Sequence, residues 1–301
     1  MIYINVQPDI PYFHWQVEVM LTNFQSIGIE KCHVVFLYDG KISNEAKRLM
    51  SRFPEYQFFF YEDERDIRAR RYIPTVKPYG MHRHLKVVDI KESIFYHDSD
   101  IIFTERIDES KFEEDDIWYL SDTVSYIGHD YVVSKGIEQA YSMCNIIGVS
   151  YDTVKENQLN SGGAQYIVKN TTDDFWWKVF TDSYLLYETL EHSEKLWTKD
   201  EYPIQKWCAE MWATLWNAWL FGFETKIDKE LDFVFATAPI SELKDCKIMH
   251  NAGVTQAATN LFFKGAYTSK SPFEVDLSHV DSQFCSYFYK KAIDRVIENR
   301  K

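Results

Sequence analysis

The sequence predicts an α/β fold built on parallel strands that are joined by crossover helices. In the first 60 residues, short apolar runs rich in β-branched and aromatic residues alternate with segments whose apolar residues recur at helical spacing. This alternation is typical of a parallel sheet with helices on its faces. The chain is 46% apolar and 17% aromatic, which is enough for a sizeable core.

The elements of the first half can be placed in order. Strands are expected at 2–6, 33–38 and 56–61, and helices at 12–27, 43–52 and from 77 onward. Asn44 is the expected cap of the second helix. In open sheets of this kind ligands bind at the carboxyl ends of the strands. Gln7 and Asp39 are therefore expected at the binding edge.

The stretch 94–103 places an acidic pair, Asp98 and Asp100, between two runs rich in Ile and Phe. Such runs indicate buried strands, and an unpaired buried charge is costly. The carboxylates therefore need a basic partner or a divalent cation, and their oxygens suit Mg²⁺ or Mn²⁺. The alternative is a polar turn between two strands.

The second half continues the pattern. Strands are expected at 117–120, 164–169, 233–236 and 247–251, and helices at 135–147, 172–191, 204–221 and 282–299. Before the second of these strands lies Asn160-Ser161-Gly162-Gly163. Adjacent glycines let a backbone approach a ligand closely, but they are equally typical of a tight turn or β-bulge.

The helix at 204–221 is rich in tryptophan, and its apolar face, Trp207 included, is expected in the core. Glu210, Thr214 and Asn217 form a narrow polar stripe on it, so Glu210 faces either solvent or a pocket. The charged segment 62–75 carries Arg68, Arg70 and Arg71. These arginines are either a solvated face or contacts to a phosphorylated ligand.

Composition argues against several classes of function. A net charge of −13 disfavours a nonspecific grip on nucleic acid, although a local basic channel stays possible. Five cysteines without a C-x-x-C pair suggest neither a zinc knuckle nor a disulfide framework, so reduced thiols and a cytoplasmic location are expected. The sequence contains no run of about 18 apolar residues and no signal-peptide pattern, so no membrane span is expected.

Three motifs together resemble GT-A-fold glycosyltransferases, which are metal-dependent and use nucleotide sugars. They are the pair Asp98-x-Asp100, the turn 160–163 and the late His250-x-x-Gly253, and the likeness covers residues 1–265. Short matches at 77–79 (Lys-Pro-Tyr) and 210–213 (Glu-Met-Trp-Ala) resemble the hydroxyproline arabinosyltransferase and peptidyl-serine galactosyltransferase group.

The resemblance implies a mixed, mostly parallel GT-A-like (Rossmann-like) sheet in a single domain, 1–301. Residues 1–122 would be its nucleotide-binding half, 123–270 its acceptor and catalytic half, and 271–301 a C-terminal helix. Asp98, Asp100 and His250 would bind Mn²⁺ or Mg²⁺ on the donor diphosphate, where the metal neutralises the leaving group.

The other roles that the resemblance implies concern donor and acceptor. Gln7, Asp39 and Lys77 would contact the nucleotide, Ser99 the sugar or ribose, and Asn160, Ser161, Gly162 and Gly163 the donor sugar. Glu210 would act as general base or stabilise the oxocarbenium-like state. One branch of the family has a phosphate-binding lysine where this chain has Gln256. Lys264, or an arginine of 68–71, is expected to substitute.

The predicted function is transfer of a hexosyl or pentosyl group from a nucleoside-diphosphate sugar, with a UDP-sugar expected first, to an unknown hydroxyl acceptor. A nucleotidyltransferase is one alternative, but the loop 7–11 lacks the Gly and Lys usual in that class. A non-catalytic carbohydrate-binding protein is another, suggested by nine Trp and 20 Tyr. Most Trp, however, fall at core spacing in helices.

Overall fold

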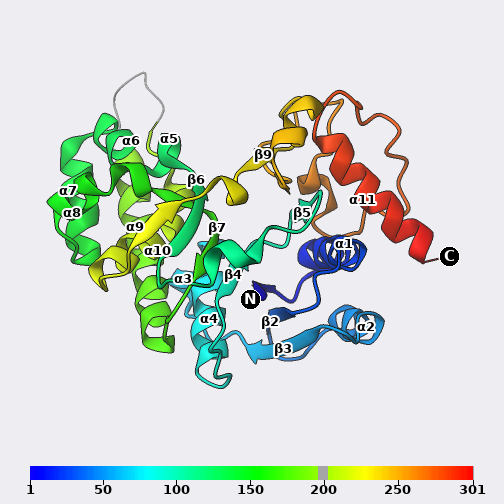
Figure 1. Ribbon diagram of the computed structural model, residues 1–301, viewed down its shortest axis with the longest axis horizontal. Helices are drawn as coiled ribbons and strands as arrows, with labels where there is room; N and C mark the ends of the chain where they lie inside the picture. The colour runs from blue at the N-terminus through cyan, green and yellow to red at the C-terminus, as the bar shows by residue number, and fades with distance from the viewer. Residues whose placement is uncertain (196–202, 301) are drawn as a thin grey trace. The chain divides into compact units, whose positions relative to one another are not determined.

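The computed structural model describes residues 1–195 and 203–300, and the chain divides into two compact units. Unit 1 comprises Met1, Asp63–Tyr96 and Ser110–Asp228. Unit 2 comprises Ile2–Glu62, His97–Glu109 and Lys229–Lys301. Figure 1 shows the chain coloured from its N-terminus to its C-terminus.

Unit 2 begins with three parallel strands in the order β3-β2-β1. They are β1 (Ile2–Pro8), β2 (Cys32–Tyr38) and β3 (Gln57–Glu62), joined by helices α1 (Pro11–Ile27) and α2 (Asn44–Arg52). The predicted alternation of strand and helix is confirmed here. The predicted cap of α2 is wrong, because Ser43 has the extended backbone and its hydroxyl accepts the Ala46 N–H. Asn44 is instead the first residue of the helix.

A second, three-stranded sheet in unit 2 has the order β5-β10-β9. Its strands are β5 (Ile101–Phe103), β9 (Phe233–Phe235) and β10 (Ile248–His250). β10 is antiparallel to β5 and parallel to β9. Trp15 of α1, Met249 of β10 and Tyr289 of α11 (Ser286–Asn299) share one buried apolar cluster with Ile102. This core therefore fixes β5 and β10 against the helices of the same unit.

Unit 1 holds strands in the order β4-β7-β6-β8, in which β7 is antiparallel to both neighbours and β6 is parallel to β8. The strands are β4 (Ile94–His97), β6 (Trp118–Asp122), β7 (Gly162–Val168) and β8 (Thr225–Ile227). The helices are α3 (Ile67–Arg70), α4 (Val76–Leu85), α5 (Val124–Ile127), α6 (His129–Ser134), α7 (Ile137–Ile147), α8 (Tyr151–Glu156), α9 (Asp173–Lys195) and α10 (Ala209–Leu220). Among these helices, α9 packs most extensively against α10 and α4 (Figure 1).

The tryptophan-rich helix differs from its prediction at one end. Trp212 and Trp216 are buried as expected, but the Trp207 residue is 60% exposed. The α-helix begins only at Ala209, and Trp207 lies in the 3₁₀ turn Lys206–Cys208. A 3₁₀ turn has about three residues per turn, so Trp207 does not lie on the buried apolar face that an α-helical period predicts for it.

The predicted α/β class with strands of both orientations and flanking helices is confirmed. Within residues 1–195 and 203–300, no helix combines the length and apolar character needed to cross a membrane. All five cysteines are free thiols. The single-domain assignment and its internal boundaries stay predictions.

Candidate metal centre and a buried carboxylate site

The acidic pair lies in the turn between β4, which ends at His97, and β5, which begins at Ile101. Asp100 is 4% exposed, whereas the side chain of Asp98 is 31% exposed. The ring of His97 is buried, and its Nδ1 donates to the carbonyl oxygen of Asp98 over 2.8 Å. Burial lowers the pKa of His97 to about 4, so the ring is neutral at pH 7. His97 thus helps to fix the turn without adding charge to it.

Strand pairing in unit 2 brings His250 to this turn. The antiparallel register of β10 and β5 places His250 opposite Ile101. The backbone N–H of Asn251 then donates to the carbonyl oxygen of Asp100 over 3.0 Å. Two segments that are far apart in the sequence are therefore held together by backbone hydrogen bonds at Asp100, the last residue of the acidic turn, and along β5.

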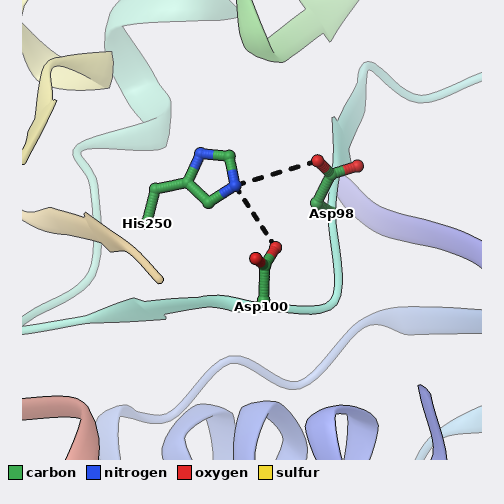
Figure 2. A group of neighbouring side chains, drawn as sticks. All are labelled: Asp98, Asp100 and His250. Atoms are coloured by element: carbon green, nitrogen blue, oxygen red, sulfur yellow. Dashed lines mark ion pairs between the residues drawn. The ribbon is translucent and has the colours of Figure 1, made fainter. Parts of the chain in front are cut away.

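The three side chains point toward one another (Figure 2). His250 Nε2 lies 3.3 Å from Asp100 Oδ1 and 3.9 Å from Asp98 Oδ2. One candidate ligand atom from each residue lies within 4.8 Å of the others. Adjacent ligand atoms of an octahedral ion lie about 3 Å apart and opposite ones about 4 Å. Two carboxylates and an imidazole so arranged fit Mn²⁺ or Mg²⁺.

Lys264 is the fourth member of the cluster. Its Nζ contacts Asp100 Oδ2, on the other carboxylate oxygen from His250. Burial by itself would raise the pKa of Asp100, but the Lys264 ammonium and His250 hold it well below its usual range. Burial likewise opposes the charge on Lys264, and Asp100 outweighs it and raises the pKa of the lysine. Lys264 and Asp100 therefore form a partly buried ion pair.

The other residues of unit 2 predicted to contact the donor lie in different surroundings. Gln7 is 1% exposed, and its Nε2 donates to the carbonyl oxygen of Val35 over 3.0 Å. Asp39 follows β2 directly and is exposed. Ser99 is buried between the two aspartates. Their roles in donor binding stay predictions.

Glu210 lies in unit 1, in the first turn of α10, and is 1% exposed. The alternative that it faces solvent is therefore wrong. Its Oε2 lies 2.8 Å from Lys77 Nζ. Its Oε1 lies 3.3 Å from the hydroxyl of Thr214 and 3.4 Å from that of Tyr96. The carboxylate is thus paired with one ammonium and approached by two hydroxyl groups.

Two tyrosines that the sequence did not single out hold this site. The backbone N–H of Glu210 donates to the Tyr72 hydroxyl over 3.0 Å, and that hydroxyl donates to the carbonyl oxygen of Trp207. Tyr72 thereby satisfies an N–H of the first helical turn, which has no partner within the helix. Lys77 Nζ also lies 5.9 Å from the centre of the Tyr96 ring. The chain has 20 tyrosines, and no pattern in the sequence distinguishes Tyr72 or Tyr96 from the others.

The two glycines of the predicted turn are explained by packing. Gly162 and Gly163 begin β7, and the register with β6 shifts between Leu120 and Ser121. A Cβ on Gly162 would lie 2.2 Å from the Cβ of Leu120, and one on Gly163 would lie 2.6 Å from the Cε of Met211. The register shift and these close contacts support the β-bulge interpretation.

The two residues before these glycines lie outside the strand. Asn160 ends the 3₁₀ helix Gln158–Asn160 and is half-buried. Ser161 is buried, and its hydroxyl donates to the carbonyl oxygen of Asn157 over 3.3 Å. A contact of residues 160–163 with the donor sugar stays a prediction.

Two arginines of the charged segment pair with α9, whereas Arg70 pairs with Asp63. Arg68 contacts Glu188 at 2.5 Å and Arg71 contacts Glu191 at 3.1 Å, and both arginine side chains are about 60% exposed. These are solvated ion pairs within unit 1, which supports the interpretation of the segment as a surface face.

Comparison with known proteins finds solved structures of similar fold. No protein-family model and no curated protein sequence matches the chain. Among solved structures, the chain is similar to the apo form of the bifunctional glycosyltransferase WbbM, with a TM-score of 0.52, 11% identity and 98% of this chain covered. That match covers 49% of the WbbM chain, so the present chain spans about half of it.

Two further structures give weaker likenesses. The galactosyltransferase LgtC, solved with donor and acceptor sugar analogues, has a TM-score of 0.48 and 11% identity, with 98% of this chain and 95% of that chain covered. Mouse xyloside xylosyltransferase 1 in its apo form has a TM-score of 0.42 and 9% identity, with 84% and 99% covered. The match to WbbM confirms the GT-A-like fold class predicted from the motifs.

Proposed function

We propose that this chain is a metal-dependent glycosyltransferase that moves a sugar from a nucleoside-diphosphate sugar to a hydroxyl acceptor. The observation that carries the proposal is the convergence of Asp98, Asp100 and His250 at the end of a strand in a glycosyltransferase-like fold. A hexose or a pentose carried by UDP is the first donor to test.

Asp98, Asp100 and His250 would hold the Mn²⁺ or Mg²⁺ ion. When bound, the ion supplies positive charge that stabilises the leaving diphosphate. The exposure of Asp98 supports this role, because that carboxylate is open to a ligand while Asp100 anchors the cluster. Backbone hydrogen bonds at Asp100 and along β5 orient the ligands before any ion arrives.

Lys264 would bind the donor diphosphate, because this chain has Gln256 at the position where one branch of the family has a phosphate-binding lysine. Its ammonium lies beside the candidate metal ligands, on Asp100. An ion bound by Asp100 would compete with that ion pair, since both need the same carboxylate. A diphosphate beside the ion would then offer Lys264 a new anionic partner. Ser99, Gln7 and Asp39 are retained as further candidate donor contacts in unit 2.

Glu210 is proposed as the carboxylate that assists the transfer, with Lys77 and the turn 160–163 in the same unit. Two observations support it. The carboxylate is buried, where electrostatic effects are strong, and it is paired with the Lys77 ammonium. Hydroxyl groups of Thr214 and Tyr96 lie at Oε1, which fixes the rotamer of the side chain. A glutamate so held could accept a proton from the acceptor or stabilise positive charge at the anomeric carbon.

A thermal-shift panel tests the proposal. Melting temperature is measured with UDP, GDP, ADP and CDP, each with Mn²⁺ and with EDTA. We expect at least one diphosphate to raise the melting temperature only with the metal, because the ion joins carboxylates and phosphate. Asp100→Asn should remove the shift, whereas Glu274→Gln, an exposed carboxylate of the same unit, should keep it. No metal-dependent shift with any nucleotide would contradict the proposal.

Product analysis separates the enzyme classes. Slow hydrolysis of UDP-glucose or UDP-xylose by a glycosyltransferase breaks the bond to the anomeric carbon and releases UDP and free sugar. A nucleotidyltransferase would instead break a bond at phosphorus, so release of UMP and sugar phosphate would favour that alternative. Glu210→Gln should lower the rate of UDP release with little change in UDP affinity. An unchanged rate would leave Glu210 with a structural role only.

A further inference from the structure

Unit 2 contains a cleft of about 490 Å³ between α1, α2, the segment 269–273 and Arg300 after α11. Helix α1 packs against both α2 and α11 and lies between them (Figure 1). The described residues that line this cleft include none of Asp98, Asp100, His250 and Lys264. Its volume is within the range of small-molecule sites, about 300–1,000 Å³.

The lining carries an excess of positive charge. Its cations are Arg48, Arg52, Lys270 and Arg300, and its carboxylates are Glu18 and Glu45. With His14 counted as neutral, two positive charges are in excess, although the whole chain carries −13. A second cleft of about 540 Å³ in the same unit shows no such excess, because its two lysines are balanced by two carboxylates: Lys244, Lys247, Glu105 and Asp245.

A buried carboxylate fixes two of the cations. The Glu18 side chain is 5% exposed, and its Oε1 lies 2.9 Å from Arg52 Nη1 and 2.9 Å from Arg300 Nε. Arg300 Nη2 also contacts Glu18 Oε2. Each guanidinium has five N–H donors, and one carboxylate neutralises only one of the two charges. Glu18 therefore orients the two arginines, and they keep unused N–H donors and one net positive charge at the cleft.

The lining also has an apolar part. Leu49 and Phe273 are buried, and the Arg300 guanidinium stacks on the Phe273 ring, 4.1 Å from its centre. His14 also lines the cleft, and its buried Nδ1 has no hydrogen-bond partner among the described residues. Such unsatisfied groups are uncommon in native proteins and are often completed by water or ligand. The cleft thus combines a cationic edge with an apolar wall.

We propose that this cleft binds a phosphate monoester of a small organic molecule, with the phosphate on the arginines and the apolar part against Leu49 and Phe273. A phosphate monoester carries a charge of about −1.5 to −2 at pH 7, which matches the two excess positive charges. Guanidinium groups bind phosphate through paired hydrogen bonds. A carboxylate ligand would neutralise only half of the excess.

Isothermal titration with phenyl phosphate in EDTA tests the site. We expect one molecule bound per chain, and affinity lowered at least about threefold by Arg48→Gln and by Lys270→Gln, because each removes one cation. Both positions are exposed, so the fold should persist, which circular dichroism checks. Lys47→Gln is the matched control: it removes the same charge from an exposed position of α2 that does not line the cleft.

Three further arms make the result decisive. Glu18→Gln should tighten binding of phenyl phosphate, since it removes a competing negative charge, and loss of fold could not produce that gain. Lys264→Gln should leave affinity unchanged, which separates this cleft from the Asp98–Asp100–His250 cluster. Inorganic phosphate and benzoate should both bind more weakly than phenyl phosphate. The proposal is overturned by no binding at 10 mM, by equal effects of Lys47→Gln and Arg48→Gln, or by tighter binding of benzoate.

Discussion

The two units each hold a lysine against a carboxylate, but the two ion pairs have different surroundings. In unit 1, Lys77 and Glu210 form an ion pair, called the closed pair below, with Glu210 1% exposed. In unit 2, Lys264 shares Asp100 with His250, and a second carboxylate, that of Asp98, is 31% exposed. The Glu210 carboxylate is enclosed, whereas the second set, called the open cluster below, includes a partly exposed carboxylate. The number of ligand groups and the solvent exposure of their carboxylates, more than the residue types, distinguish a candidate cation site from an enclosed ion pair.

The largest expected effect is on the closed pair. Lys77→Met should lower the free energy of unfolding by about 3 kcal/mol, because it leaves the buried Glu210 carboxylate without its partner. The double variant Lys77→Met/Glu210→Gln should recover most of that loss, since no charge is then buried. Urea unfolding measures both.

The matched control is Lys91→Met, whose partner is Asp89 in a pair with side chains 82% and 77% exposed. That change should shift stability by no more than about 0.5 kcal/mol. A double variant as unstable as Lys77→Met alone would show that the buried charge is not the cause.

The open cluster should respond in ion binding. Asp100→Asn should weaken Mn²⁺ binding at least about tenfold, because it removes the buried carboxylate ligand that contacts His250 and Lys264. Titration calorimetry with Mn²⁺ measures the change, with circular dichroism as the check on folding. Unchanged affinity would mean that the acidic turn is not a metal site.

Lys264→Gln should change two affinities in opposite directions. Loss of the ammonium removes its repulsion of a cation, so Mn²⁺ should bind about fivefold more tightly, a change of about 1 kcal/mol. UDP in the presence of Mn²⁺ should bind more weakly, because the proposed phosphate contact is gone. A fall in both affinities would indicate that Lys264 serves only to hold the loop in place.

The smallest effect concerns a third carboxylate. Burial raises the pKa of Asp182 in unit 1, despite hydrogen bonds from Lys178 and Asn217 at 2.8 and 2.7 Å. An acid with a raised folded pKa binds its proton more tightly when folded, so its ionisation costs stability as the pH rises above about 3.8. Asp182→Asn should therefore flatten this decline between pH 4 and 7. Thermal unfolding at a series of pH values measures the decline. An equally steep decline in the variant would show that ionisation of Asp182 does not cause it.

Local patterns in the sequence predicted the elements and the open cluster well. The strand runs around Asp98 and Asp100 were visible because β4 and β5 are buried, and buried strands need continuous apolar residues. His250 was found because it ends a short strand before a glycine. These features depend on residues that are neighbours in the sequence, so they can be predicted from the sequence alone.

Features that depend on distant packing were not predictable. Lys77 was expected at a nucleotide, and nothing local indicates that it contacts Glu210, which belongs to another helix. The glycines of β7 were ambiguous because their reason lies in Leu120 and Met211. Trp207 was misplaced because an apolar period does not reveal where an α-helix gives way to a 3₁₀ turn.

The pairing of β5 with β10 has a consequence for how this protein folds. The register of Ile101 with His250 closes a loop that spans about half of the chain, and such nonlocal contacts form slowly because the loss of chain entropy precedes the gain. The ligand set therefore cannot exist until that closure is complete. An ion that binds only the closed form adds about 2.7 kcal/mol to the free energy of unfolding at a hundredfold excess over its dissociation constant. Metal in the refolding buffer would accordingly slow unfolding while leaving early folding steps unchanged.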